Sequence, residues 1–211
     1  MSDIVYEGAI NGDRTLASSD IRATEMLRYI DEKDIDPTEM RMIAKGESGL
    51  VSLIPGDSDA GLGHLLDRHF DGTEINTDAD ETTFFPSGGT PTSRGTGPSA
   101  ELPTGMNRDD IAPSLRRAIE DGSEDGGTYI ATFRSSRYGI KKVQVNTNSG
   151  TVATAYPLEG PNVRRWNRNT DQREKWTSSG WTRWTKPYQG SNTSPSLMTP
   201  ITIGAIGLNK A

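Results

Sequence analysis

The sequence predicts an α+β fold, in which N-terminal helices pack on a small antiparallel sheet and a loop-rich, extended segment follows. Between residues 18 and 122, apolar side chains recur mostly at helical spacing. Between residues 128 and 158 they alternate at strand spacing instead. Helices followed by strands in this order are typical of the α+β class. The 23 glycines, the 12 prolines and a hydrophobic fraction of 32% indicate a small core with much loop.

Four segments are predicted to be helices, because each has a capping residue at its start or a glycine at its end. They are residues 18–35, 36–46, about 57–72 and 107–122. The second has Asp36 as its N-cap and Pro37 at its first helical position.

Short strands are predicted at 49–57, 128–136, 138–146 and 151–158, and the last two are joined by the hairpin signal "TNSG". Residues 86–105 are rich in Gly, Pro, Ser and Thr and are predicted to form a loop. We expect three regions along the chain. They are a helical region at 1–45, an α+β domain at 46–165, and a basic, tryptophan-rich extension with a tail at 166–211.

Composition excludes several classes of function. No run of about 18 apolar residues is present, so no membrane span is expected and the chain should be soluble. With no cysteine, a thiolate nucleophile or thiolate metal site is impossible. Residues 1–125 carry a net charge of −15 and residues 126–211 a net charge of +9. This division indicates either a phosphate-binding surface or two halves that attract each other in the fold.

Both histidines of the chain lie in "GLGHLLDRHFDG", residues 61–72. His64 and Arg68 are four residues apart and share one face of a helix, where a guanidinium beside an imidazole indicates chemistry. His69 is five residues from His64, about 140° around an α-helix, so both can address one substrate only if the helix ends or distorts near Arg68. The alternative is that these are packed or surface histidines. A zinc site is disfavoured, since the metalloprotease glutamate is missing from the motif.

A second candidate cluster lies in "GTVATAYPLEGPNV". In a strand, Val152, Thr154 and Tyr156 should project from one face, with the two hydroxyl-bearing residues about 7 Å apart. Two such hydroxyls can bind a phosphate or orient a ribose. The alternative is that Thr and Tyr are simply good strand formers.

Together these motifs resemble a known family. "GLGHLLDRHFDG", "TTFFP", the helix "DDIAPSLRRAIEDG" and "YGIKKVQVN…GTVATAYPLEGPNV" follow the order seen in bacterial EndoU-like and barnase-like ribonuclease domains. Such domains occur attached to phage head proteins and to polymorphic toxins. The resemblance covers about residues 45–165 and rests mainly on the histidine-bearing helix and the "TAYP" strand.

The resemblance implies cleavage of RNA without a metal or cofactor, through attack by a ribose 2′-hydroxyl that leaves a 2′,3′-cyclic phosphate. If the roles of the family's residues are transferred to this sequence, the resemblance implies that His64 and His69 are the acid and base. Arg68 is the charge stabiliser, and Thr154 and Tyr156 contact the phosphate or ribose. The sequence departs from EndoU-like domains, which usually separate their two histidines further and add a lysine. This departure leaves the alternatives that one histidine is structural or that the domain is inactive.

The region after the predicted domain combines basic and aromatic residues. Arginines provide phosphate contacts and tryptophans provide stacking faces, which suits single-stranded RNA. The alternative is a hairpin whose tryptophans pack together or on a neighbouring subunit. The candidate RNA-binding residues are Arg164, Arg165, Trp166, Arg168, Trp176, Trp181, Arg183 and Trp184.

Two functions of different classes are therefore predicted. The first is a toxin-type or phage-associated endoribonuclease that acts in the cytoplasm of a target or host cell and is held in check by an inhibitor (immunity) protein. The second is a structural component of a phage or virus particle with an inactive nuclease-like fold, which the small predicted core favours. A module that binds nucleic acid without cleaving it is a third possibility.

Overall fold

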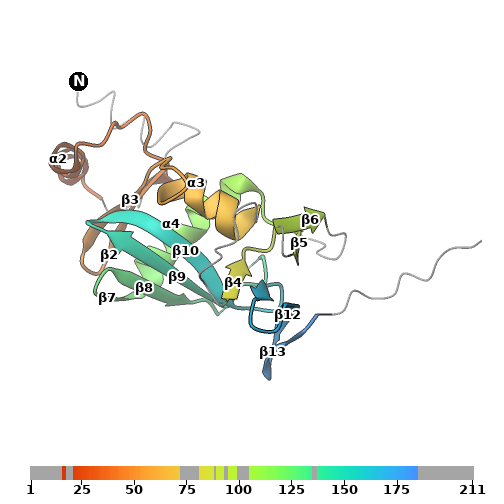
Figure 1. Ribbon diagram of the computed structural model, residues 1–211. Coiled ribbons are helices and arrows are strands. Elements are labelled where there is room, and N and C mark those ends of the chain that lie inside the picture. The colour runs from red at the N-terminus through yellow and green to blue at the C-terminus, as the bar shows by residue number, and fades with distance from the viewer. Residues whose placement is uncertain are drawn as a thin grey trace, which may run out of the picture.

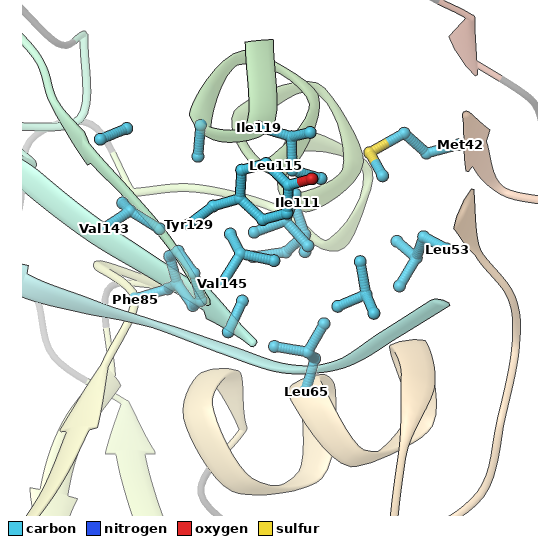
Figure 2. Packing of buried hydrophobic residues seen from close by; sticks show 14 of the residues in the cluster. Met42, Leu53, Leu65, Phe85, Ile111, Leu115, Ile119, Tyr129, Val143 and Val145 are labelled. Carbon is cyan, nitrogen blue, oxygen red and sulfur yellow. The ribbon is translucent and has the colours of Figure 1, made fainter. Parts of the chain in front are cut away.

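The computed structural model describes residues 16–17, 21–71, 81–87, 89–92, 95–98, 105–134 and 137–184. For 16–17, 89–92 and 95–98 it describes the backbone. The fold is α+β, as predicted: a curled sheet lies between helix α4 on one side and helix α3 on the other (Figures 1 and 2).

The larger sheet has seven strands in the order β1-β2-β3-β10-β9-β8-β7. It is mixed, whereas a purely antiparallel sheet was expected, because β1 runs parallel to β2 and β3 runs parallel to β10. Its strands are β1 Leu16–Ala17, β2 Met42–Gly46, β3 Gly49–Leu53, β7 Ser123–Asp125, β8 Thr128–Thr132, β9 Lys142–Asn148 and β10 Thr151–Glu159. The N-terminal region thus contributes strands to the same sheet as the predicted domain.

A second, antiparallel sheet has four strands in the order β13-β12-β11-β4. They are β4 Glu81–Phe84, β11 Arg164–Asn167, β12 Gln172–Thr177 and β13 Gly180–Arg183. Strand β11 crosses the boundary expected between residues 165 and 166. The basic, tryptophan-rich extension therefore belongs to the same sheet as β4.

The segment predicted as a loop at 86–105 contains two paired strands, β5 Gly89–Thr92 and β6 Gly95–Pro98. The backbone N–H and C=O groups pair there although the composition is typical of loops. Of the extension and tail expected at 166–211, residues 185–211 lie outside the described residues.

Three of the four predicted helices are confirmed. The helical elements are α2 Ala23–Lys33, α3 Gly61–Leu65, the π-helical turn η1 Leu66–Phe70, the 3₁₀ turn η2 Arg108–Asp110 and α4 Ile111–Asp121. None of the helices in the described ranges has the length and apolar character needed to cross a membrane.

The helix predicted at 36–46 is wrong. Asp36 Oδ1 accepts hydrogen bonds from the backbone N–H of Thr38 at 2.8 Å and from its hydroxyl at 2.7 Å, which closes a turn rather than capping a helix. The chain then enters β2, where Ile43 faces the cluster around α2 while Met42 and Ala44 face the main core. Because both faces of this strand are buried, its sequence shows no polar alternation.

The main core lies between α4 and the sheet. Figure 2 shows Ile111, Leu115 and Ile119 pointing from α4 towards the strands, at the helical spacing of four that the sequence displays. All three side chains are fully buried. The partners labelled in Figure 2 include Met42, Leu53, Tyr129, Val143 and Val145.

Replacing Leu115 with alanine tests this core. Removal of a fully buried leucine side chain leaves a cavity, so we expect the free energy of unfolding to fall by about 2–5 kcal/mol. Ile130→Ala on the exposed side of β8 is the matched control and should cost less than about 1 kcal/mol. Urea denaturation of the three proteins gives both values, and equal losses would contradict this packing.

Candidate active site

The helix that carries both histidines begins at a tight loop. Asp57 Oδ1 accepts hydrogen bonds from the backbone N–H of Asp59 at 2.8 Å and of Ala60 at 3.3 Å. Gly61 follows with φ of 82°, and a Cβ there would lie 2.9 Å from the Cα of Gly56. Both the backbone angle and the close approach require glycine at this position.

The helix that carries both histidines is distorted near Arg68. The sequence spacing required such a distortion if both histidines are to address one substrate. After α3 the chain continues as the π-helical turn η1, in which the N–H of Asp71 donates to the carbonyl of Leu66, five residues earlier, at 2.6 Å. This wider turn brings the two imidazoles together. The ring centroids of His64 and His69 are 6.1 Å apart, in an edge-to-face arrangement.

His69 is fastened to strand β4. Its Nδ1 lies 2.9 Å from the carbonyl oxygen of Thr83, and its own carbonyl accepts the N–H of Phe85 at 2.8 Å. Because a carbonyl only accepts hydrogen bonds, Nδ1 must carry the proton, and the neutral ring presents its lone pair at Nε2. The ring also packs against Tyr156, with centroids 5.2 Å apart.

Burial keeps His69 neutral. The side chain is 7% exposed, and desolvation is the main cause that lowers its pKa from 6.5 to about 4. The nearby His64 and Arg68 lower this pKa as well, while the hydrogen bond to Thr83 opposes the shift. At neutral pH, His69 is therefore available as a proton acceptor.

Strand β10 supplies the opposite wall of the site. Thr154, Tyr156 and Leu158 alternate along it and line the pocket described below. Val152 was expected on this face but is buried in the main core. The reason is an irregularity in the pairing of β10 with β9 between Val152 and Thr154, which shifts the alternation by one residue.

These elements enclose a pocket of about 280 Å³. Of the five predicted catalytic residues, four line it: Arg68, His69, Thr154 and Tyr156. His64 is not among the lining residues. Its side chain is 5% exposed and meets the His69 ring edge-to-face, with Nδ1 donating to the carbonyl of Ser58 at 2.6 Å. The remaining lining residues are Glu81, Thr82, Thr83 and Leu158.

Three residues of this pocket hold buried polar atoms without a partner. Arg68 Nε, Thr83 Oγ1 and Thr154 Oγ1 make no hydrogen bond with any described residue. A buried polar group left unpaired costs about 1–3 kcal/mol, so each one requires an explanation. All three belong to residues that line the same pocket.

Two charged side chains, Arg68 and Glu81, are among the residues that line the pocket. Arg68 forms no ion pair with the described part of the chain. Glu81, on β4, is bound by the guanidinium of Arg165, which also binds Glu174. One arginine thus lies between two carboxylates.

The predicted RNA-binding arginines and tryptophans largely contact each other. The guanidinium of Arg165 lies 4.3 Å from the ring centre of Trp181, and that of Arg164 lies 5.2 Å from the ring centre of Trp184. Trp176 packs edge-to-face on Trp181, with centroids 5.4 Å apart. This is the packed-hairpin arrangement that the sequence left as an alternative.

The other predicted RNA-binding residues occupy the same small sheet or its first turn. Trp166 is half-buried on β11, opposite Thr82 of β4. Arg168 and Arg183 are exposed, and neither side chain is ion-paired with a described residue.

Sequence reasoning missed Thr83 and Glu81. Both lie in the segment 81–84, whose threonines were seen only as part of a motif and received no role. No local pattern shows that this strand crosses the histidine-bearing turn. Within the described ranges, no group of three or more potential metal ligands comes together.

Titration of His69 should make stability depend on pH. In the unfolded chain a histidine binds its proton below about pH 6.5, whereas folded His69 resists protonation down to about pH 4. The stabilisation that results from a neutral His69 is therefore fully present above pH 6.5. As the pH falls towards 4, the free energy of unfolding decreases by roughly 3 kcal/mol. Urea denaturation between pH 4 and 8 measures this loss, and His69→Gln should show a flatter profile. Identical profiles would contradict a buried neutral imidazole.

The sequence was also compared with known proteins. No known protein family matches the chain, and no curated protein matches its sequence. The functional assignment below therefore rests on the pocket and the chemistry of its side chains.

Proposed function

We propose that the chain is a metal-independent endoribonuclease that cleaves single-stranded RNA by transesterification. The observation that carries this proposal is the meeting of Arg68, His69, Thr154 and Tyr156 around one pocket, although the sequence separates the two pairs by about 85 residues. The pocket combines a neutral imidazole, a guanidinium without an ion-pair partner among the described residues, and hydroxyls. These are the groups that phosphoryl transfer to an internal hydroxyl requires.

The reaction begins with proton removal from the ribose 2′-hydroxyl. His69 accepts this proton at Nε2, because Nδ1 already donates to Thr83. The 2′-oxygen then forms a bond to phosphorus, and the bond from phosphorus to the 5′-oxygen breaks. The products are a 2′,3′-cyclic phosphate and a free 5′-hydroxyl.

The negative charge that accumulates on the phosphate oxygens during the reaction must be stabilised by a cation and by hydrogen-bond donors. Arg68 supplies a permanent positive charge, and the hydroxyls of Thr83 and Thr154 supply neutral donors. Such donors act most strongly on the charge that develops in the transition state.

The leaving 5′-oxygen requires a proton. Tyr156 lines the pocket, packs on His69 and carries a hydroxyl, so we assign this donation to Tyr156. His64, which the resemblance implied as a second proton-transfer group, is given a positioning role here. It packs against the His69 ring and anchors the loop through Ser58.

Substitution of the pocket residues tests this proposal. We expect His69→Ala to lower kcat/KM on a labelled single-stranded RNA by about 10²–10⁴-fold, because the base is lost. Arg68→Ala should lower it about 10²–10³-fold. His64→Ala should cost at least about tenfold less than His69→Ala, since a supporting residue is removed. Products are separated by electrophoresis and checked for 2′,3′-cyclic phosphate ends.

Matched controls use the same residue types away from the pocket. Arg28→Ala on α2 and Thr132→Val on β8 remove exposed side chains and should leave cleavage within about twofold of the starting value. If folded protein cleaves no RNA, or if His69→Ala leaves cleavage unchanged, the ribonuclease proposal is wrong. The architectural function predicted from sequence would then be favoured.

The pH profile of cleavage provides a second test. In the free protein His69 must be neutral to accept a proton, and its pKa is about 4. We expect kcat/KM to rise with pH through about 4 and to level off above pH 5, because this parameter reports the free enzyme. If kcat/KM instead rises with a midpoint between pH 6 and 7, the base is a histidine that is exposed to water.

A further inference from the structure

A second pocket lies beside helix α4, the helix on the opposite side of the sheet from α3 (Figures 1 and 2). Residues of α4 and of the segment that joins β8 to β9 line it, and its volume is about 170 Å³. None of these residues lines the pocket around His69, and no step of the proposed cleavage uses them. We call it the arginine pocket.

Two arginines line the arginine pocket, and each lies over an aromatic ring that also lines it. The guanidinium of Arg117 is 4.7 Å from the ring centre of Phe133, and that of Arg137 is 5.3 Å from the ring centre of Tyr138. Both arginines are exposed, and Arg117 also pairs with Asp121 through Nε at 3.2 Å. Attraction between each cation and its ring holds the guanidinium in place, so the pocket presents two positive charges in defined positions.

One carboxylate, Asp110, lines the same pocket, and both of its oxygens accept hydrogen bonds. The Tyr138 hydroxyl donates to Oδ1 at 2.5 Å, and the backbone N–H of Asn107 donates to Oδ2 at 2.8 Å. Arg137 forms no ion pair with the described part of the chain. Two arginines against one hydrogen-bonded carboxylate give the lining a net positive charge, which favours an anionic ligand.

The size of the arginine pocket indicates that one group of a larger ligand enters it. Sites that enclose a free small molecule start near roughly 300 Å³, and this pocket has about 170 Å³. Acidic peptides and nucleic acids are both polymers with repeated negative charges. Nucleic acid also carries bases, which stack on aromatic rings and on guanidinium groups when the strand is single. The pairing of each arginine with a ring therefore favours single-stranded nucleic acid.

The arginine pocket and the pocket around His69 lie close to each other at one end of the sheet. Ile140 lines the former and Leu158 lines the latter. Each is one residue away from a hydrogen bond that the N–H of Lys141 donates to the carbonyl of Glu159 at 2.7 Å. The Cα atoms of Ile140 and Leu158 are therefore within roughly 13 Å of each other. Lys141 is exposed and adds a positive charge between the pockets, so one strand of a few nucleotides can contact both.

We propose that the arginine pocket is a second binding site, which takes a phosphate and a neighbouring base of single-stranded nucleic acid. Arg117 and Arg137 supply the positive charge and the stacking surface. The inference concerns binding alone and goes beyond the proposed function, because it holds whether or not the bound strand is cleaved.

Binding of a 2′-O-methyl RNA tests this inference, since such a strand has no free 2′-hydroxyl and cannot be cleaved by transesterification. A labelled strand of roughly 12 nucleotides is long enough to cover a typical single-strand site. Fluorescence anisotropy gives its Kd at several salt concentrations. We expect the double variant Arg117→Ala/Arg137→Ala to raise Kd by about 5- to 50-fold, and to reduce the slope of log Kd against log salt by about 1–2.

The matched control is the double variant Arg22→Ala/Arg28→Ala. It also removes two exposed arginines, one at the start of α2 and one within it, so the change in net charge is the same. Arg28 is paired with an acidic residue four positions later, as Arg117 is. This control should leave Kd within about twofold of the starting value. An equal loss of affinity in both double variants would overturn the inference, because it would show an effect of total charge.

Two further ligands distinguish nucleic acid from other anions. A 2′-O-methyl strand of the same length without bases should bind the starting protein more weakly than the strand with bases, and the double variant Arg117→Ala/Arg137→Ala should reduce this difference. A peptide of glutamates with the same charge should bind more weakly than either strand. If the peptide binds as tightly as the strand with bases, or if the starting protein binds no strand, the inference is wrong.

The outcome is independent of the ribonuclease proposal. If RNA is not cleaved but the double variant Arg117→Ala/Arg137→Ala weakens binding as expected, the arginine pocket is supported and the ribonuclease proposal fails. If RNA is cleaved but this variant binds the 2′-O-methyl strand as tightly as the starting protein does, the ribonuclease proposal is supported and the second site is refuted.

Discussion

The hydrogen bond from His69 Nδ1 to the carbonyl of Thr83 is the contact on which the site depends. It joins a turn of the first half of the chain to an edge of the second sheet, and it leaves Nε2 as the proton acceptor. The backbone bond from Phe85 to His69 reinforces the same junction. Without this junction, the imidazole would lose both its orientation and the seclusion that keeps it neutral.

The second sheet supports this junction from outside. Strand β4 is an edge strand of that sheet, and β11 pairs with it over its whole length. The arginines and tryptophans of the outer strands hold one another through ring and ion-pair contacts. Their first role is therefore to stiffen the wall that carries Thr83 and Glu81. Arg168 and Arg183 of the same region are exposed instead.

Much of the fold could be predicted from the sequence where the signals are local. Helix α4 shows apolar residues at every fourth position, Asn107 caps the 3₁₀ turn η2 that leads into it, and the strands around 147–150 flank a hairpin turn. Strand β2 was mistaken for a helix, because its burial on both faces removes alternation and Asp36 imitates a cap. Its pairing with the adjacent β3 and with the distant β1 settles its conformation.

The site, like the fold, could be predicted only where the sequence carries a local signal. His69, Arg68, Thr154 and Tyr156 are residue types with recognisable chemistry, and the spacing of the two histidines requires a distortion near Arg68 if both are to address one substrate. Glu81 and Thr83 carry no local signal, because they become part of the site only when β4 crosses the turn. The bulge in β10 similarly depends on its partner β9, and it removed Val152 from the expected face.

The π-helical turn also constrains the local geometry of the helix. A turn closed by a bond between residues five apart accommodates one more residue than an α-helical turn in the same axial rise. Ordinary α-geometry with the same number of residues would place the second imidazole about 140° around the helix from the first and would swing it away from β4. The local widening of the helix is thus as essential as the identity of the two rings, and homologues should retain it.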